Sequence, residues 1–136
     1  WPMGCLDEEG SSYAIEFKGA DWRTLAPWFV DCHSSAFSFM TDAAFRYFLP
    51  AALCHNLGPG SMVEPEFHLV NCVVDESSFR DSSRARILLF THEERAAVCD
   101  FLHNSFQWSW RPEAYEVAVR DFWDPVTGLQ ELTQTP

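Results

Sequence analysis

Residues 41–57 read TDAAFRYFLPAALCHNL, and this stretch sets the fold class of the chain. Thr41 is a favourable helix N-cap, and Asp42 suits the positive end of a helix dipole. Large apolar residues then recur three and four positions apart, which is the period of one helix face. They are Phe45, Phe48, Leu49, Leu53 and Leu57. We therefore expect an α-helix over residues 41–57.

Pro50 lies inside this helical pattern, where it removes one backbone hydrogen bond and crowds the preceding turn. The apolar period continues past the proline to Leu57, so we expect a kink at Pro50 and not an end. The run Gly58-Pro59-Gly60 then stops the helix.

Residues 64–74 carry the next helical pattern, with Pro65 in the first turn and apolar residues on one face. The valine-rich end of this segment leaves a buried strand as the weaker alternative. Residues 75–86 are rich in Ser, Asp and Arg, and we expect a surface loop there. The short apolar run at 87–90 leaves a strand or extended segment as an alternative to helix.

Thr91 and Glu94 are spaced as a capping box, in which each residue pairs with the backbone N–H of the other. A helix is expected to follow this box and to continue to about Ser105. Pro112 is well placed to open a last helix, which the pair Asp124-Pro125 ends.

The chain has the size and composition of one globular domain. It has 136 residues, of which 47% are hydrophobic, enough to fill a core without a metal or a disulfide. We expect a mainly α fold, a single compact domain of about five orthogonally packed helices over residues 1–136. Residues 1–11 form its entry loop and residues 128–136 its tail in this prediction.

The net charge is −11, because twenty Asp and Glu residues face only nine Lys and Arg. A nucleic-acid partner needs a basic surface, so nucleic acid is a poor match for this chain. An anionic membrane surface is disfavoured for the same reason, and no apolar run reaches the length of a membrane span. A basic protein, in contrast, would be attracted and steered.

Cysteine usage indicates a reducing compartment. The chain has an odd number of cysteines, without a CxxC pair: Cys5, Cys32, Cys54, Cys72 and Cys99. Most lie in apolar patterns, where a free thiol behaves as a small hydrophobic group. We therefore expect a cytoplasmic protein without a disulfide framework.

Residues 36–53, which read AFSFMTDAAFRYFLPAAL, resemble the signature of an uncharacterised bacterial domain family. Members of that family read roughly LSFLTPEAFRYYLPAYL at this point, with Pro-Glu where this chain has Asp42-Ala43. Residues 17–22 and 90–102 match further family segments in the same order. The resemblance covers residues 15–103 and implies a small helical bacterial protein, with no catalytic residue to carry over.

One set of residues has the spacing of a metal site. His68 and Cys72 are four residues apart on one expected helix, and Cys99 and His103 are four apart on another. Two such pairs side by side could supply two thiolates and two imidazoles to a tetrahedral zinc ion. Neither pair has the tight spacing of dedicated zinc motifs, so packing in the core is the favoured interpretation.

The sequence contains no recognisable set of catalytic residues. The pairs Cys32-His33 and Cys54-His55 are neighbours in sequence, and neighbours on a helix point about 100° apart. Neither pair therefore forms an evident thiolate–imidazolium couple, and no phosphate-binding or nucleophile-elbow motif is present. We expect no enzymatic activity and no cofactor.

The end of the chain carries the residues most typical of a protein interface, where Trp side chains contribute much of the binding energy. They are Trp108, Trp110, Glu113, Glu116, Asp121, Trp123 and Asp124. The equally weighted alternative is that these aromatics close the core.

The function predicted from these features is a small acidic protein-binding module, most concretely a bacterial immunity protein that neutralises a toxin enzyme. The alternatives are a zinc-binding or enzymatic domain that uses His68, Cys72, Cys99 and His103, and a structural part of a larger protein.

Overall fold

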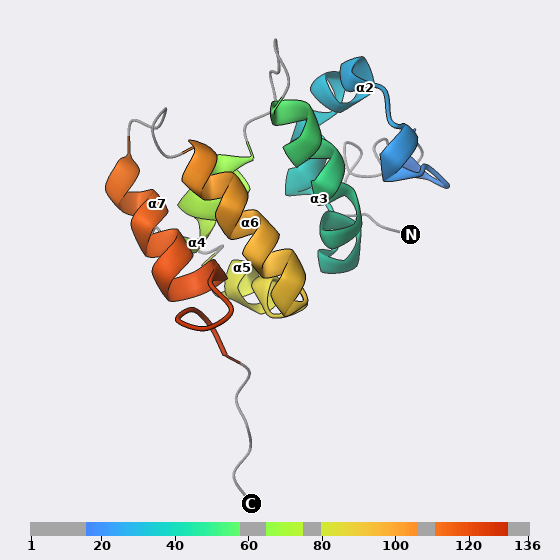
Figure 1. The fold of residues 1–136 in the computed structure, drawn as a ribbon. Coiled ribbons are helices and arrows are strands. Elements are labelled where there is room, and N and C mark those ends of the chain that lie inside the picture. The colour runs from blue at the N-terminus through green and yellow to red at the C-terminus, as the bar shows by residue number, and fades with distance from the viewer. Residues whose placement is uncertain (1–15, 58–64, 75–79, 106–110, 131–136) are drawn as a thin grey trace, which may run out of the picture. The chain divides into compact units, whose positions relative to one another are not determined.

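The computed structural model describes residues 16–57, 65–74, 80–105 and 111–130. Within these ranges the regular elements are helices and no β-strand occurs, which confirms the mainly α prediction (Figure 1). The residues group into two compact units, 1–65 and 66–136, each described below by itself. The single-domain organisation and the orthogonal packing stay predictions. Of the predicted tail, residues 128–130 are described and contain no helix.

The first unit contains two short 3₁₀ helices, η1 (Trp22–Thr24) and η2 (Ser34–Ser38), and two α-helices, α2 (Pro27–Cys32) and α3 (Asp42–Asn56). The hydroxyl of Thr41 accepts a 3.2 Å hydrogen bond from the backbone N–H of Ala44, so the predicted N-cap is confirmed. The helix α3 continues through Pro50, as its apolar period predicts.

The core of the first unit surrounds Phe17, which is almost completely buried. Its ring packs edge-to-face against Phe29 of α2, with centroids 5.2 Å apart, and against Phe48 of α3 at 4.9 Å. Such edge-to-face pairs add stability beyond the apolar area that they bury. Phe17 therefore joins α2 and α3. The other buried residues of this unit include Val30, Phe37, Met40, Phe45, Leu49 and Ala52.

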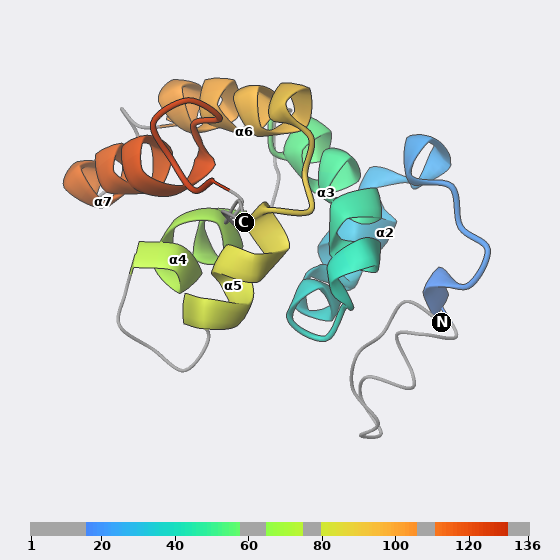
Figure 2. The same cartoon turned by 90° about the horizontal axis from the view of Figure 1, so that it is seen from below.

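The second unit begins with the π-helical turn η3 (Phe67–Asn71) and continues through α4 (Cys72–Val74), α5 (Arg80–Ile87) and α6 (His92–Ser105). It ends with α7 (Pro112–Ala118) and the π-helical turn η5 (Val119–Trp123). Both views show α6 and α7 side by side, with α5 next to α4 (Figures 1 and 2). The helix predicted for 64–74 is confirmed over its described residues, and the strand alternative there is wrong.

The surface loop predicted for residues 75–86 is also wrong from Arg80 onward, because these residues form α5. Arg and Ala are strong helix formers, and the apolar stem of an arginine can cover hydrophobic surface beside a helix. The guanidinium of Arg84 lies 4.9 Å from the ring centroid of Phe122, so α5 is held by a cation–π contact. An apolar period cannot reveal such a contact.

No strand or extended segment forms at residues 87–90 either. Ile87 is the last residue of α5, and residues 88–90 make the turn into α6. Ile87 and Phe90 are buried, and the ring of Phe90 lies 5.3 Å from that of Trp123. The apolar run thus closes one helix and leads into the next.

The capping box ahead of α6 is confirmed. The backbone N–H of Thr91 donates to Glu94 Oε1 at 2.8 Å, and the N–H of Glu94 donates to Thr91 Oγ1 at 3.1 Å. Pro112 begins α7 as predicted, and the helical backbone ends before Asp124.

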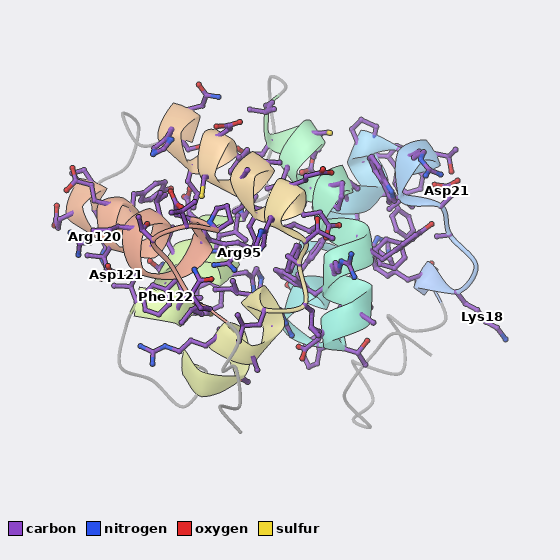
Figure 3. All side chains as sticks on the ribbon, turned by 60° about the horizontal axis from the view of Figure 1, so that its bottom comes forward. Lys18, Asp21, Arg95, Arg120, Asp121 and Phe122 are labelled. Carbon is purple, nitrogen blue, oxygen red and sulfur yellow. The ribbon has the colours of Figure 1, made fainter. Side chains whose placement is uncertain are left out.

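The end of η5 is tied to α6 and to η3. Arg95, near the start of α6, is only 2% exposed and lies beside Phe122 (Figure 3). Its guanidinium donates to the carbonyl oxygens of Phe122, Trp123 and Asp124. The indole Nε1 of Trp123 donates to the carbonyl oxygen of Leu69 in η3 at 2.8 Å. These bonds fix the last helix in the second unit.

Candidate binding sites

Trp123 was predicted to belong to an aromatic interface, but its side chain is 1% exposed and belongs to the core. The core-closing alternative is correct for this residue, because its indole N–H is satisfied by Leu69 and its ring packs on Phe90. Trp108 and Trp110 lie outside the described residues.

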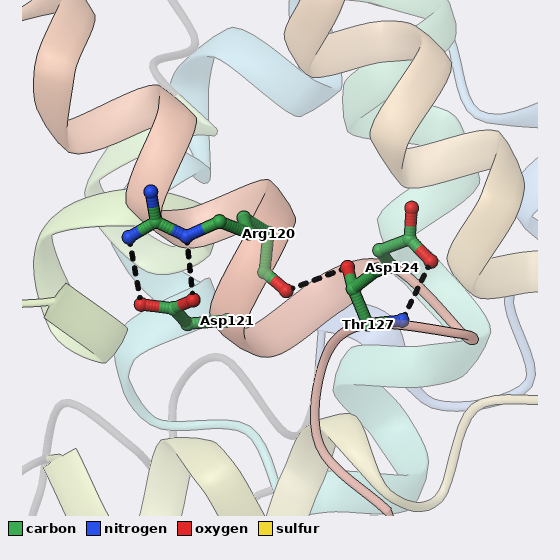
Figure 4. Close-up of polar contacts among 4 residues, drawn as sticks. All are labelled: Arg120, Asp121, Asp124 and Thr127. Carbon is green, nitrogen blue, oxygen red and sulfur yellow. Dashed lines mark hydrogen bonds and ion pairs between the residues drawn. The ribbon is translucent and has the colours of Figure 1, made fainter.

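The acidic residues of the predicted interface have different environments. Glu113 and Glu116 lie exposed on α7. Asp121 is exposed but paired, because Arg120 Nε and Nη2 donate to its two carboxylate oxygens at 2.8 and 3.1 Å (Figure 4). The hydrogen bond from Arg120 lowers the pKa of Asp121. The charge of Asp121 is thus compensated within its own helix.

Asp124 is a turn residue and not a free surface acid. Its Oδ1 accepts the backbone N–H of Val126 at 2.7 Å and of Thr127 at 3.1 Å. These two bonds lower the pKa of Asp124 and hold it ionised. Thr127 Oγ1 in turn donates to the carbonyl oxygen of Arg120 at 2.7 Å, which closes the turn onto η5 (Figure 4). Asp124 therefore has a structural role in this turn, and its assignment to a partner surface stays a prediction.

The four predicted zinc ligands, His68, Cys72, Cys99 and His103, all lie within the described residues but do not assemble. Across those residues, no group of three or more His, Cys, Asp or Glu side chains could hold a metal ion. Burial raises the pKa of the Cys99 thiol to about 11, and Asp124 adds to the rise. Zinc needs a thiolate, so this environment opposes metal binding at Cys99.

His68 and the two sequential Cys-His pairs show no nucleophilic couple. Burial lowers the pKa of His68 to about 4, and the positive charge of Arg86 adds to the shift, so its imidazole is neutral near pH 7. His33 Nδ1 bonds the carbonyl oxygen of Phe29 at 2.8 Å. His55 Nε2 lies 2.9 Å from Asp31 Oδ1. Each of these last two imidazoles is therefore held by a group other than the neighbouring cysteine.

Local sequence patterns do not reveal the Asp31–His55 pair, because it joins residues 24 positions apart. Asp31 lies on α2 and His55 on α3, so the bond fastens the two helices to each other. Both side chains are largely buried, which shields the pair from solvent screening.

Next to this pair, residues of η1, α2 and α3 line a cavity of about 500 Å³ that is open to solvent. Its polar groups are Arg23, Cys54 and His55. Its apolar wall is made by Trp22, Leu25, Pro27, Val30 and Ala51. A volume of this size and an apolar wall with a few polar groups are typical of small-molecule sites.

Among the described residues of the first unit, Trp28 is the largest exposed aromatic group, and it was not among the predicted interface residues. Its side chain is 67% exposed, although Val30 on the same helix is buried. Two positions on a helix correspond to about 200°, which places Trp28 and Val30 on opposite faces of α2. The helical period of this short segment could have revealed the exposed indole.

None of the described helices has the length and apolar content of a membrane span. Comparisons with protein-family models, with curated proteins and with solved structures found no match to this chain. The likeness of residues 36–53 to a bacterial family signature therefore stays a prediction.

Proposed function

We propose that the chain is a protein-binding module that acts on a basic partner, most concretely a bacterial immunity protein that neutralises a toxin enzyme in the cytoplasm. The exposed indole of Trp28 is the main support. Trp is the residue type most enriched among side chains that dominate the energy of protein interfaces. A large aromatic group that remains in water on a short helix gains free energy when a partner covers it.

The charge of the chain supports a basic partner. A net charge of −11 accelerates encounter with a positive surface and slows encounter with a negative one. A nuclease has a positive active site because its substrate is a polyanion. The charge of an acidic protein is complementary to that site, so such a protein can bind over it. Glu113 and Glu116 are exposed carboxylates on α7 that could take part in such contact.

The cysteines at positions 32, 54 and 99 form no disulfide within the part of the chain that the structure describes, which supports a reducing compartment.

The test is binding of the full chain to the product of the adjacent gene, measured by calorimetry at about 0.15 M salt, where the Debye length is about 8 Å. We expect a Kd below about 10 μM, equivalent to about −7 kcal/mol, and weaker binding in more salt. Trp28→Ala is expected to weaken binding at least tenfold, as a dominant interface residue does. Leu89→Ala, which removes an exposed apolar side chain from the second unit, is the matched control.

Binding weaker than this limit would defeat the proposal. Equal binding by the wild type and Trp28→Ala would show that Trp28 does not contribute to the interface. The proposal would then lose its main support. Circular dichroism of both variants confirms that the fold is retained.

A further inference from the structure

We propose that the cavity between η1, α2 and α3 binds a small organic anion with an apolar body. The inference does not depend on the protein partner, because it rests on the walls and charges of one cavity within the first unit. Its volume of about 500 Å³ fits a molecule of one or two rings.

The walls provide the apolar contact. The apolar lining includes Trp22 of η1, Pro27 and Val30 of α2, and Ala51 of α3. Ala51 is the smallest of these side chains, which leaves space where a larger residue would fill the cavity. An aromatic or aliphatic group that enters displaces water from these walls, and this is favourable in proportion to the area covered.

The polar groups select the charge of the ligand. None of the residues described as lining the cavity is acidic, although the chain as a whole has more than twice as many acids as bases. Arg23 supplies a permanent positive charge, and its guanidinium carbon lies 5.6 Å from the centroid of the Trp22 ring. A carboxylate or sulfonate on a ring that packs against Trp22 would meet this guanidinium directly.

Asp21 competes with such a ligand for Arg23, because Asp21 Oδ2 lies 3.5 Å from Arg23 Nη1. The other carboxylate oxygen, Oδ1, accepts the backbone N–H of Arg23 at 3.0 Å and caps η1. The Arg23 side chain remains 70% exposed, so the pair is weak and an incoming anion can replace it.

The cavity is preorganised by the Asp31–His55 bond, which fastens α2 to α3 at its edge. A wall that is already fixed does not have to be ordered when the ligand binds, and this increases affinity.

The test uses two dyes of the same shape: anilinonaphthalene sulfonate, which is an anion, and N-phenylnaphthylamine, which is uncharged. Both fluoresce more strongly in an apolar site, so fluorescence titration of the full chain gives both affinities. We expect the sulfonate to bind at least threefold more tightly than the uncharged dye. Arg23→Met is expected to reduce only the sulfonate affinity, by about threefold to fivefold, as suits an exposed ion pair.

Two further variants sharpen the result. Asp21→Asn keeps an oxygen to cap η1 but removes the competing charge, so it is expected to strengthen sulfonate binding about twofold. Arg120→Met removes an exposed arginine from the second unit and is expected to change neither affinity.

The position of the dye is checked with the two exposed cysteines of the first unit. Cys54 lines the cavity and Cys32 does not. Iodoacetamide transfers its acetamide group to a thiolate and releases iodide. Saturating sulfonate dye is therefore expected to slow alkylation of Cys54 and leave Cys32 unchanged, as measured by mass spectrometry of the peptides. The proposal is overturned by equal affinity for the two dyes, by no measurable sulfonate binding, by an unaffected Arg23→Met variant, or by equal protection of both cysteines.

Discussion

The Nε atom of Arg95 donates a 3.0 Å hydrogen bond to the carbonyl oxygen of Trp123, which lies 28 residues later. Its Nη2 atom donates to the carbonyl oxygens of Phe122 at 2.7 Å and Asp124 at 3.2 Å. The last carbonyls of a helix have no partner within that helix. A buried arginine of one helix thus satisfies the end of another, which makes it the central polar contact of the second unit.

Replacement of Arg95 by methionine is expected to lower the free energy of unfolding by about 2–4 kcal/mol. The carbonyl oxygen of Trp123 loses the donor from Arg95, and the carbonyl oxygens of Phe122 and Asp124 keep only their bonds from the backbone N–H groups of Leu129 and Gly128. Urea denaturation followed by circular dichroism measures the change. The exposed Arg120→Met variant is the control and is expected to change stability by less than about 0.5 kcal/mol. A loss below about 1 kcal/mol for Arg95→Met would contradict the capping role.

Trp123→Phe removes the indole N–H that donates a hydrogen bond to the carbonyl oxygen of Leu69, and it leaves space in the core. We expect this variant to lose about 2–3 kcal/mol of unfolding free energy, from the lost bond and the reduced packing. Trp28→Phe makes the same chemical change at an exposed indole, so it is expected to lose less than about 0.5 kcal/mol. Similar losses in the two variants would show that Trp123 is not the buried residue described here.

Stability should fall as the pH falls from about 6.5 to about 4, because of His68. The unfolded chain binds a proton at this imidazole near pH 6.5, whereas burial delays protonation in the folded chain to about pH 4. The unfolded state therefore binds more protons within this window, and acid favours unfolding. Between pH 7 and pH 5 the wild type is expected to lose about 1–2 kcal/mol more than His68→Gln does. Parallel urea titrations at the two pH values measure this difference, and equal losses would exclude His68 as the source.

Two glycines should respond differently to alanine. A Cβ atom at Gly128 would lie 2.5 Å from the carbonyl oxygen of Phe122 and 2.6 Å from that of Asp124. Gly128→Ala is therefore expected to destabilise the chain by about 3 kcal/mol, because backbone atoms must move. Gly19 has a φ of +73° and open space around it, so Gly19→Ala is expected to cost only about 1 kcal/mol of backbone strain. Thermal unfolding of both variants tests the order, and the reverse order would contradict the close approach at Gly128.

The cysteines should differ in reactivity. Cys99 is buried and its thiol has a raised pKa of about 11, so almost none of it is thiolate near pH 7.5. Cys32 and Cys54 are exposed. In the folded chain without ligand we expect iodoacetamide to modify Cys32 and Cys54 well before Cys99, whereas all three react in urea. Early modification of Cys99 would show that its surroundings are more open than described.

Local patterns in the sequence predicted the helices that begin with strong caps. The Thr41 cap and the Thr91–Glu94 box depend on residues three positions apart, and both are present. The helix α5 was missed because its anchor, the contact of Arg84 with Phe122, joins distant residues. The binding features were missed for a similar reason, since the Asp31–His55 bond and the cavity beside it exist only after α2 and α3 pack together.

Trp123 was assigned to an interface from its residue type, with closing of the core as the equally weighted alternative. A regular helix would place Phe122 and Trp123 about 100° apart. The residues Val119–Trp123 instead form a π-helical turn, in which Phe122 and Trp123 are both buried. Residue periodicity alone does not mark such a turn.

A π-helical turn is equivalent to one extra residue accommodated within a helix. Removal of a single residue from Val119–Trp123 would restore a regular helix, yet it would rotate everything that follows by more than a quarter of a turn. The indole would then point away from Leu69, and the helix end would leave the guanidinium of Arg95. The exposed positions Arg120 and Asp121 should therefore accept changes of residue type, whereas an insertion or deletion anywhere in this segment should disrupt the end of the helix.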